Sequence, residues 1–197
     1  MAYTTKALVK TYLGITSTGD DTLIDALLAA AQKAIDTYTQ RTFEATGDTT
    51  RYYTVGHDTV GRLLYLDHEI CSITSVKTDA DATTPTSLTE NTDYIGLPRN
   101  ESQFNRLEIL SSSTYTWTYT DDPEFGVEVA GKFAYSTTAP DDIAQACKRL
   151  TAYYYRQKDS QVFDVTAIPE AGVISVPVGI PADVKKTLDL YRTKVYI

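Results

Sequence analysis

The sequence is poor in the side chains on which most catalytic and metal chemistry depends. Its 197 residues include two cysteines and two histidines. Cys71 and Cys147 are far apart and lie in segments of different character, which excludes a disulfide framework and a Cys-x-x-Cys motif. His57 and His68 leave few groups for acid-base work or for metal binding. We therefore predict no catalytic residues, no metal ligands and no cofactor.

Sequence signals of several other protein classes are also missing. No apolar run approaches the roughly 18–20 residues that a membrane span needs, and the N-terminus has no basic start followed by an apolar stretch. There is no glycine loop that cradles phosphate, no Gly-x-Ser-x-Gly elbow and no His-Glu-x-x-His helix. We expect no membrane partner, and a protein that is made and kept in a cytosol.

Basic residues are scarce in the middle of the chain. Residues 43–138 carry fifteen acidic and six basic side chains, a net charge of −9. Residues 1–42 carry four of each, and residues 139–197 carry seven acids and eight bases, a net charge of +1. Affinity for nucleic acid rests mainly on Lys and Arg that neutralise phosphates. The acidic middle therefore predicts no tight nucleic-acid binding.

The N-terminal segment has the pattern of two helices. Thr4 or Thr5 can cap a short helix that stops at Gly14. A long helix then begins at Asp20-Asp21, whose carboxylates can cap it and complement the helix dipole. It continues to about residue 41, with apolar residues every three or four positions. These apolar residues are Leu23, Ile24, Leu27, Leu28, Ala31, Ala34, Ile35 and Tyr38.

The C-terminal segment predicts two more helices. Each begins with a proline that is followed by an acidic and then an aliphatic residue, a pattern typical of helix starts. These starts are Pro140-Asp141-Asp142-Ile143 and Pro181-Ala182-Asp183-Val184. The first of these helices carries Ile143, Ala146, Cys147, Leu150 and Tyr154 on one face, and the final helix carries Val184, Leu188, Tyr191 and Val195.

Between these helical ends, short runs rich in Thr, Tyr, Val and Ile are broken by Gly, Pro, Asp and Asn, which is typical of strands and turns. The expected strands are 51–55, 62–66, 70–78, 93–97, 106–110, 114–120 and 126–134. The predicted fold is α+β: a four-helix core formed by both chain ends, 1–42 and 139–197, with an inserted antiparallel β-rich module, 43–138, that is a small sandwich or barrel. Loop-closure entropy grows only with the logarithm of length, so a folded insert of this size is tolerated.

Clusters of polar residues have structural explanations that we favour over chemical ones. Asp20-Asp21 and Asp141-Asp142 open predicted helices, and Asp121-Asp122 lies in a predicted turn. The two histidines also lie between predicted strands, as turn residues do. In Tyr153-Tyr154-Tyr155-Arg156, consecutive side chains point in different directions on a helix, so one tyrosine is expected in the core while the others can pack on a partner.

Residues 159–180 are apolar without clear periodicity, and two interpretations are open. The segment either wraps over its own helices or orders against a neighbouring subunit. The candidate contact residues are Val162, Phe163, Ile168, Val173, Ile174 and Val176.

Spaced apolar and turn residues over most of the chain resemble the head-tail connector (adaptor) proteins of tailed bacteriophages. The matching segments are Leu8-x-x-x-Tyr12-Leu13-Gly14-Ile15, Asp20-Asp21-x-Leu23-Ile24-x-x-Leu27-Leu28-x-x-Ala31, Ile35-Asp36-x-Tyr38-Thr39-x-Arg41-Thr42-Phe43, Leu64-Tyr65-Leu66-Asp67, Ile70-x-x-Ile73-x-x-Val76, Val127-x-Val129-x-Gly131, Pro140-x-x-Ile143-x-x-Ala146 and Ile180-Pro181-x-Asp183-Val184. Compact members of that family have only a short connection where this chain has residues 43–138, so here the insert is expected to broaden the ring or to contact the tail or capsid.

The resemblance implies a structural protein of the virion neck, assembled in the cytoplasm of a host bacterium. Such proteins form a homo-oligomeric ring, usually dodecameric, beneath the portal protein. The ring extends the channel through which duplex DNA passes without sequence-specific binding, and it presents a surface for stopper or tail-completion proteins. The residues expected to dock on the portal are Lys185, Lys186, Tyr191, Arg192 and Tyr196. The segment 159–180 is then expected to lie toward the channel or the adjacent subunit.

Two alternatives remain open at the level of sequence. The chain could be another virion structural protein, such as a tail-completion or stopper component. It could also be a carbohydrate-binding β-module protein, since Tyr115, Trp117 and Tyr119 would share one face of a strand and form an aromatic platform. That face can equally belong to the core, which we favour.

Overall fold

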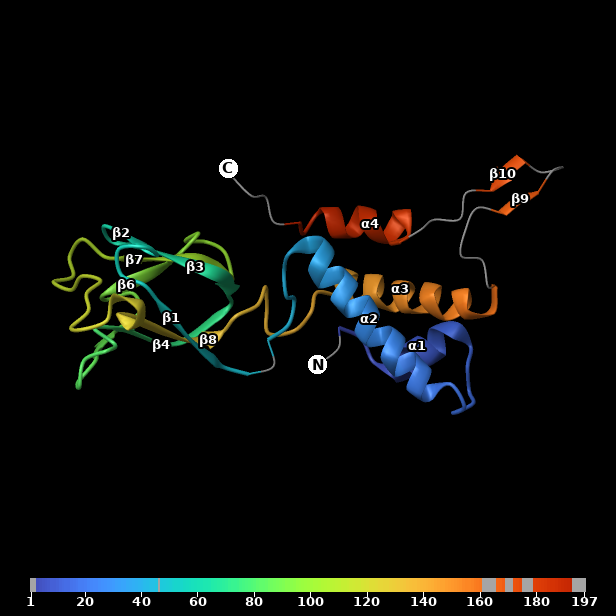
Figure 1. The fold of residues 1–197 in the computed structure, drawn as a ribbon, viewed down its shortest axis with the longest axis horizontal. Coiled ribbons are helices and arrows are strands. Elements are labelled where there is room, and N and C mark those ends of the chain that lie inside the picture. The colour runs from blue at the N-terminus through green and yellow to red at the C-terminus, as the bar shows by residue number, and fades with distance from the viewer. Residues whose placement is uncertain (1–2, 46, 161–165, 169–171, 175–178, 193–197) are drawn as a thin grey trace. The chain divides into compact units, whose positions relative to one another are not determined.

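The computed structural model describes residues 3–45, 47–160, 166–168, 172–174 and 179–192, with the backbone alone for 159–160, 166–168 and 172–174. The chain divides into two compact units (Figure 1). Residues 1–41 and 139–197 form the helical unit, and residues 42–138 form the strand unit.

The described part of the helical unit contains α1 (Lys6–Leu13), α2 (Asp21–Thr39), α3 (Asp141–Ser160) and α4 (Ala182–Asp189). The short first helix has the expected ends. The Thr5 side chain accepts a hydrogen bond from the Leu8 backbone N–H at 3.3 Å, and Gly14 ends the helix with a φ of 73°.

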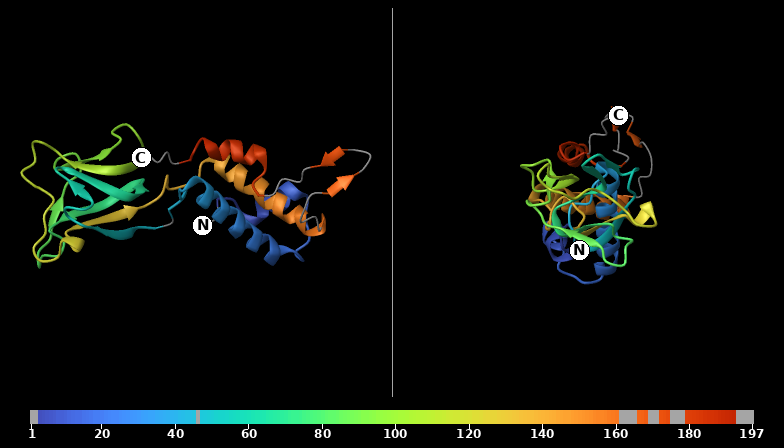
Figure 2. Two further views of the ribbon diagram at one scale, coloured as in Figure 1. Left: turned by 45° about the horizontal axis from the view of Figure 1, so that its top comes forward. Right: turned by 90° about the vertical axis from the view of Figure 1, so that its left-hand side faces the viewer.

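The two long helices, α2 and α3, pack against each other although the whole strand unit separates them in sequence. α1 lies against both, and α4 lies along α3 and also contacts α2 (Figures 1 and 2). The buried apolar side chains of these helices are Val9, Ile24, Leu28, Ala31, Ile35, Ile143, Ala146, Cys147, Leu150, Ala152, Val184 and Leu188. Apolar residues at helical spacing on both chain ends therefore share one core.

A polar contact at the start of α2 differs from the expected cap. Asp20 is the N-cap residue but its side chain makes no capping hydrogen bond. Its carboxylate instead accepts hydrogen bonds from the Tyr155 hydroxyl and, at 3.0 Å, from Lys158 Nζ, both on α3. Asp21, in the first turn, pairs with Lys10 Nζ of α1 at 2.6 Å. These acids thus link helices rather than closing the end of one.

The strand unit is built from two antiparallel four-stranded sheets, in the orders β1-β8-β4-β5 and β2-β3-β7-β6. The strands are β1 (Thr49–Tyr53), β2 (Thr59–Val60), β3 (Leu63–Ile70), β4 (Ser72–Thr78), β5 (Thr86–Leu88), β6 (Tyr94–Leu97), β7 (Phe104–Ile109) and β8 (Val127–Lys132), with a short 3₁₀ turn η1 (Pro123–Phe125) before β8.

Side chains from both sheets fill one core, so the strand unit is a small sandwich. The core residues are Tyr53, Leu64, Ile70, Val76, Leu88, Tyr94, Leu107, Ile109, Trp117, Val127, Val129 and Phe133. Burial alternates along β8, as its sequence predicts. The mixed α+β class predicted from sequence is confirmed.

The strand expected over residues 114–120 is absent from the described fold. The reason lies in Thr78 of β4, whose hydroxyl takes the place of a ladder partner. It accepts from the Thr118 backbone N–H at 2.9 Å and lies 3.1 Å from the Thr116 carbonyl oxygen. The Thr118 carbonyl also accepts from the Asp79 N–H, just beyond β4, at 3.0 Å. The segment therefore makes isolated hydrogen bonds at the end of β4, one set of them to a side chain, and forms no continuous ladder with the sheet.

The two ends of the strand unit are joined to each other by backbone hydrogen bonds. The Tyr135 N–H donates to the Thr42 carbonyl at 2.8 Å, and the Ala45 N–H donates to the Ser136 carbonyl at 3.2 Å. The Phe43 and Tyr135 rings also pack, with centroids 5.7 Å apart. The chain therefore enters and leaves this unit at the same place.

The final part of the chain differs from expectation in two respects. Residues 159–180, expected to be irregular, include a two-stranded antiparallel pair, β9 (Thr166–Ile168) and β10 (Gly172–Ile174). The final helix was expected to carry Tyr191, yet α4 ends at Asp189, where the Tyr191 N–H bonds to the Leu188 carbonyl at 3.0 Å in a tighter turn.

We predict that Gly131→Ala destabilises the strand unit. A Cβ at this position in the central strand β8 would lie 2.2 Å from the Ser72 carbonyl oxygen. Such overpacking against backbone costs about 1–3 kcal/mol. Urea unfolding followed by fluorescence of Trp117, the single tryptophan, reports on this unit. The matched control is Gly47→Ala, where a Cβ meets nothing within 4 Å; equal unfolding midpoints for the two variants would contradict the prediction.

We also predict that Asp20 makes the helical unit sensitive to acid. The hydrogen bond from Tyr155 and the contact with Lys158 lower the pKa of the Asp20 carboxyl. A carboxyl whose pKa is lower in the folded state stabilises the fold above its unfolded pKa, about 3.9, and this stabilisation is lost as the pH falls through the folded pKa.

The variant Asp20→Asn isolates this charge because Asn has nearly the same size and keeps a side-chain oxygen that can accept a hydrogen bond from Tyr155. Thermal unfolding followed by far-UV circular dichroism should show a lower midpoint for the variant at neutral pH. The gap between the two proteins should close as the pH falls below about 4. A gap that stays constant across this range would show that the Asp20 charge is not responsible.

Candidate functional site

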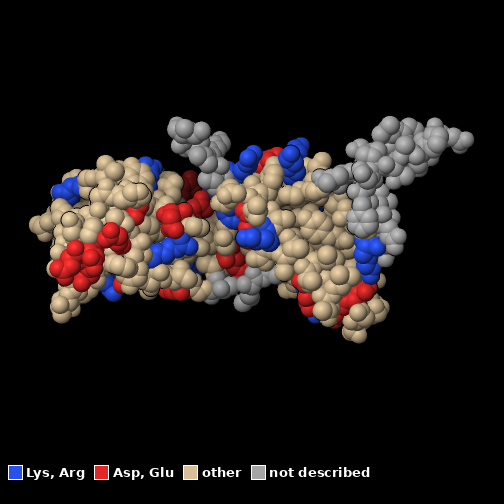
Figure 3. Space-filling model, viewed as in Figure 1, with Lys and Arg blue, Asp and Glu red and all other residues tan. Residues whose placement is uncertain are grey.

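The exposed side of α4 carries basic side chains. Val184 and Leu188 are buried on one face of this helix, while Lys185 and Lys186 are exposed. Arg192, three residues beyond the helix, is exposed as well. Figure 3 shows Lys and Arg atoms gathered over α4 with acidic atoms among them. We call Lys185, Lys186 and Arg192 the α4 basic face.

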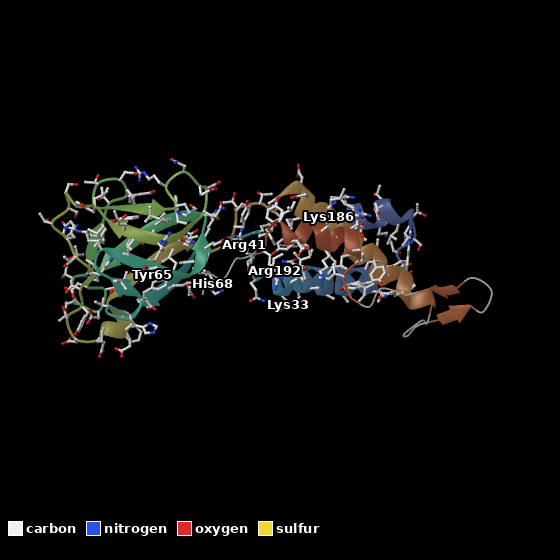
Figure 4. The ribbon with its side chains drawn as sticks, turned by 90° about the horizontal axis from the view of Figure 1, so that it is seen from above. Lys33, Arg41, Tyr65, His68, Lys186 and Arg192 are labelled. Carbon is white, nitrogen blue, oxygen red and sulfur yellow. The ribbon has the colours of Figure 1, made fainter. Side chains whose placement is uncertain are left out.

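Tyr38 of α2 holds part of this face in place. The Lys185 ammonium lies 5.9 Å and the Arg192 guanidinium 5.7 Å from the centre of its ring. The Tyr38 hydroxyl donates a hydrogen bond to Asp189, and this bond raises the pKa of the tyrosine. Figure 4, in which Lys186 and Arg192 are labelled, looks down on α4. The two cations are attracted to one aromatic ring, which limits their conformational freedom.

The other residues expected to dock are placed differently or lie outside the description. Tyr191 is half-buried, and its hydroxyl donates to the carboxylate of Asp142 at the start of α3, with oxygen distances of 2.9 and 2.8 Å. It therefore fastens the end of α4 to the helical unit. Tyr196 lies outside the described residues.

The candidate contact residues of the 159–180 segment lie wholly or partly outside the description. Val162, Phe163 and Val176 lie outside the described residues. Ile168 belongs to β9, and Val173 and Ile174 belong to β10, but only their backbones are described.

The helical unit also contains a pocket of about 190 Å³ that the sequence reasoning missed. It lies where α1, α3 and the start of α4 meet. Its lining residues are Tyr12, Arg149, Ala152, Tyr153, Arg156, Pro181, Asp183 and Val184. The four residues from α3 recur at spacings of three, four and seven, so they form a second stripe beside the core stripe of that helix. This spacing is the signal that could have revealed the pocket.

The histidines and cysteines do not converge on a common site. His57 is exposed beside Asp58. His68, expected in a turn, lies within β3, with Nδ1 3.0 Å from the Asp67 carboxylate. Cys147 is buried in the helical core, and burial raises its pKa to about 12. Among the described side chains, no three His, Cys, Asp or Glu residues gather as a metal site would require.

The aromatic platform considered for carbohydrate binding does not form. Trp117 is buried in the sandwich core, and its Nε1–H donates to the Arg62 carbonyl oxygen at 2.9 Å. Tyr115 and Tyr119 are exposed, at 40% and 45%. The three rings therefore do not share a face. The core placement favoured from sequence for this face holds for Trp117 and is wrong for Tyr115 and Tyr119. In the described part of the chain, no helix is long and apolar enough to span a membrane.

Comparison with known families identifies the chain. The model of the head completion protein family matches residues 2–194. The chain belongs to the head completion protein family. This match covers both units and confirms the resemblance to phage connector-type proteins. As a member of this family, the chain is a structural component of a phage-like particle. No curated protein matches it.

Solved structures share the fold of this head completion protein at low identity. A chain in the neck of an empty gene transfer agent (GTA) particle, computed with C6 symmetry, is 20% identical, with 98% of this chain and 90% of that chain covered and a TM-score of 0.59. One in the neck of a native GTA particle, computed with C12 symmetry, is 19% identical, with coverages of 97% and 89% and a TM-score of 0.59. A chain in the virion of a native GTA particle is 20% identical, with coverages of 98% and 90% and a TM-score of 0.57.

We predict that α4 is held to the helical unit by its buried apolar residues. Leu188→Ala should lower the free energy that holds α4 against the other helices by about 2–5 kcal/mol, because Leu188 is fully buried. Hydrogen exchange of the amides in 182–189 should therefore quicken strongly. Leu190→Ala is the control, since Leu190 is 81% exposed. Similar exchange in the two variants would contradict the prediction.

Proposed function

We propose that this family member is a connector in the neck of a tailed-phage particle, where copies form a ring under the portal protein. The ring would extend the DNA channel and offer a docking surface to stopper or tail-completion proteins. The observation that carries this proposal is the family match over residues 2–194, which includes both units. The fold shared with chains from GTA necks of C6 and C12 symmetry supports it.

The charge distribution fits a channel component. The strand unit has fifteen acidic and six basic side chains, and its sequence has no glycine loop that cradles phosphate. An acidic surface repels the phosphate backbone, so duplex DNA could pass without being held. We propose that the helical unit makes the portal contact, while the strand unit broadens the ring or contacts the tail or capsid.

We further propose that the α4 basic face docks on the portal. Two of its cations are already positioned by Tyr38, so less side-chain entropy is lost when they bind. Charged groups at the edge of an interface mainly speed association and orient the partner. An acidic surface on the portal would be the complementary partner.

The test is the double variant Lys185→Glu/Lys186→Glu. Both side chains are exposed, so the fold should be retained, while binding to purified portal should weaken by at least about tenfold, equivalent to about 1.4 kcal/mol. Surface plasmon resonance at several salt concentrations measures this. Lys33→Glu, an exposed lysine on α2, controls for loss of positive charge. Portal binding equal to that of the control would place the docking surface elsewhere.

A further inference from the structure

The pocket of the helical unit has an apolar floor and a charged rim. Ala152 and Val184 are buried at its base, and the rings of Tyr12 and Tyr153 line it. Its volume of about 190 Å³ exceeds the roughly 150 Å³ in which an apolar protein cavity binds benzene. The pocket is therefore large enough for one aromatic side chain.

Two arginines of α3 line this pocket. Arg149 and Arg156 are seven residues apart, about 10 Å along the helix, and both are exposed. Arg149 is paired with Asp183 at the start of α4. With one acid against two guanidinium groups, the rim is positive. An occupant that carries an aromatic ring beside carboxylates would fit both the floor and the rim.

The strand unit presents such a group at η1. Phe125 is 51% exposed, and its ring packs edge-on against Tyr52, with centroids 5.6 Å apart. Asp121, Asp122 and Glu124, all exposed, precede it in sequence. Figure 3 shows acidic atoms gathered on the strand unit. Large aromatic side chains half-exposed to water are enriched at protein interfaces.

Hydrogen bonds fix the segment that carries Phe125. The Asp81 carboxylate accepts from the backbone N–H groups of Thr120, Asp121 and Asp122, the last two at 2.6 and 2.8 Å. The Pro123 carbonyl accepts from Val55 N–H at 2.9 Å, and the Gly126 carbonyl accepts from Ala80 N–H at 3.0 Å. Because the segment is already ordered, placing its aromatic ring in a partner costs little conformational entropy.

We infer that in the assembled ring the Phe125 side chain of one copy inserts into the α1/α3/α4 pocket of the next copy, with Glu124 and its neighbouring acids facing Arg149 and Arg156. The partner is a second copy because the two surfaces are complementary in charge and lie on different units of the same chain. A ring of identical chains requires two different, complementary surfaces on each copy. This inference rests on the proposed ring.

The first arm of the test is a photo-crosslink. p-Benzoylphenylalanine replaces Phe125 in chains assembled into particles, and a share of the copies is isotopically heavy. Irradiation followed by mass spectrometry should join position 125 to the pocket segments 12 or 149–156 of another copy, seen as mixed light and heavy pairs. Crosslinks to other segments or proteins, or no crosslink in assembled particles, would overturn the inference.

The second arm is a charge exchange. Glu124→Arg or Arg156→Glu alone should reduce incorporation into particles by about tenfold or more, because each places like charges together. The double variant restores opposite charges between neighbouring copies and should recover incorporation to within about twofold of wild type. A merely structural defect would not be rescued in this way.

Controls separate this inference from the proposed function. Lys33→Glu should incorporate like wild type, and unchanged Trp117 fluorescence and thermal midpoints check the fold of each variant. If wild type is present in particles but Glu124→Arg and Arg156→Glu incorporate like Lys33→Glu, the pocket contact is wrong while the neck role stands. If wild type itself is absent from particles, both proposals fail.

Discussion

The packing of α2 on α3 is the interaction on which the rest of the structure depends, because it joins the two ends of the chain across the whole strand unit. It is possible because the strand unit brings its own ends together: the Tyr135 N–H bonds to Thr42, and Ala45 N–H bonds to Ser136. The sandwich therefore interrupts the helical core in sequence without separating its halves in space. Loop-closure entropy then adds little to the cost of the insertion.

Two consequences for function follow from this arrangement. The helical unit offers a scaffold on which α4 displays cations positioned by Tyr38, next to a pocket formed with α1 and α3. The strand unit supplies most of the negative charge and a fixed aromatic side chain, Phe125. The chain thus distributes unlike surfaces over two units. This distribution suits the role proposed for this member of the head completion protein family, in which each copy would contact a neighbouring copy and the portal.

Local signals made much of the fold predictable. Thr5 and Gly14 mark the ends of α1, and the alternation in β8 matches its burial. The failures came from contacts that local patterns do not encode. The segment 114–120 has strand composition, but a hydroxyl from Thr78 takes the ladder position. The sequence did not single out Arg149 and Arg156 as neighbours of a pocket, since only the folded arrangement brings α1 and α4 beside them.

The central claim is that the chain is a ring component of the particle neck, matched to the portal. The most direct measurement is quantitative mass spectrometry of purified particles, with the copy number of this chain compared with that of the portal protein. The account predicts near-equal copy numbers. A much larger number, as in a tail tube or capsid, or the absence of the chain from particles, would contradict it.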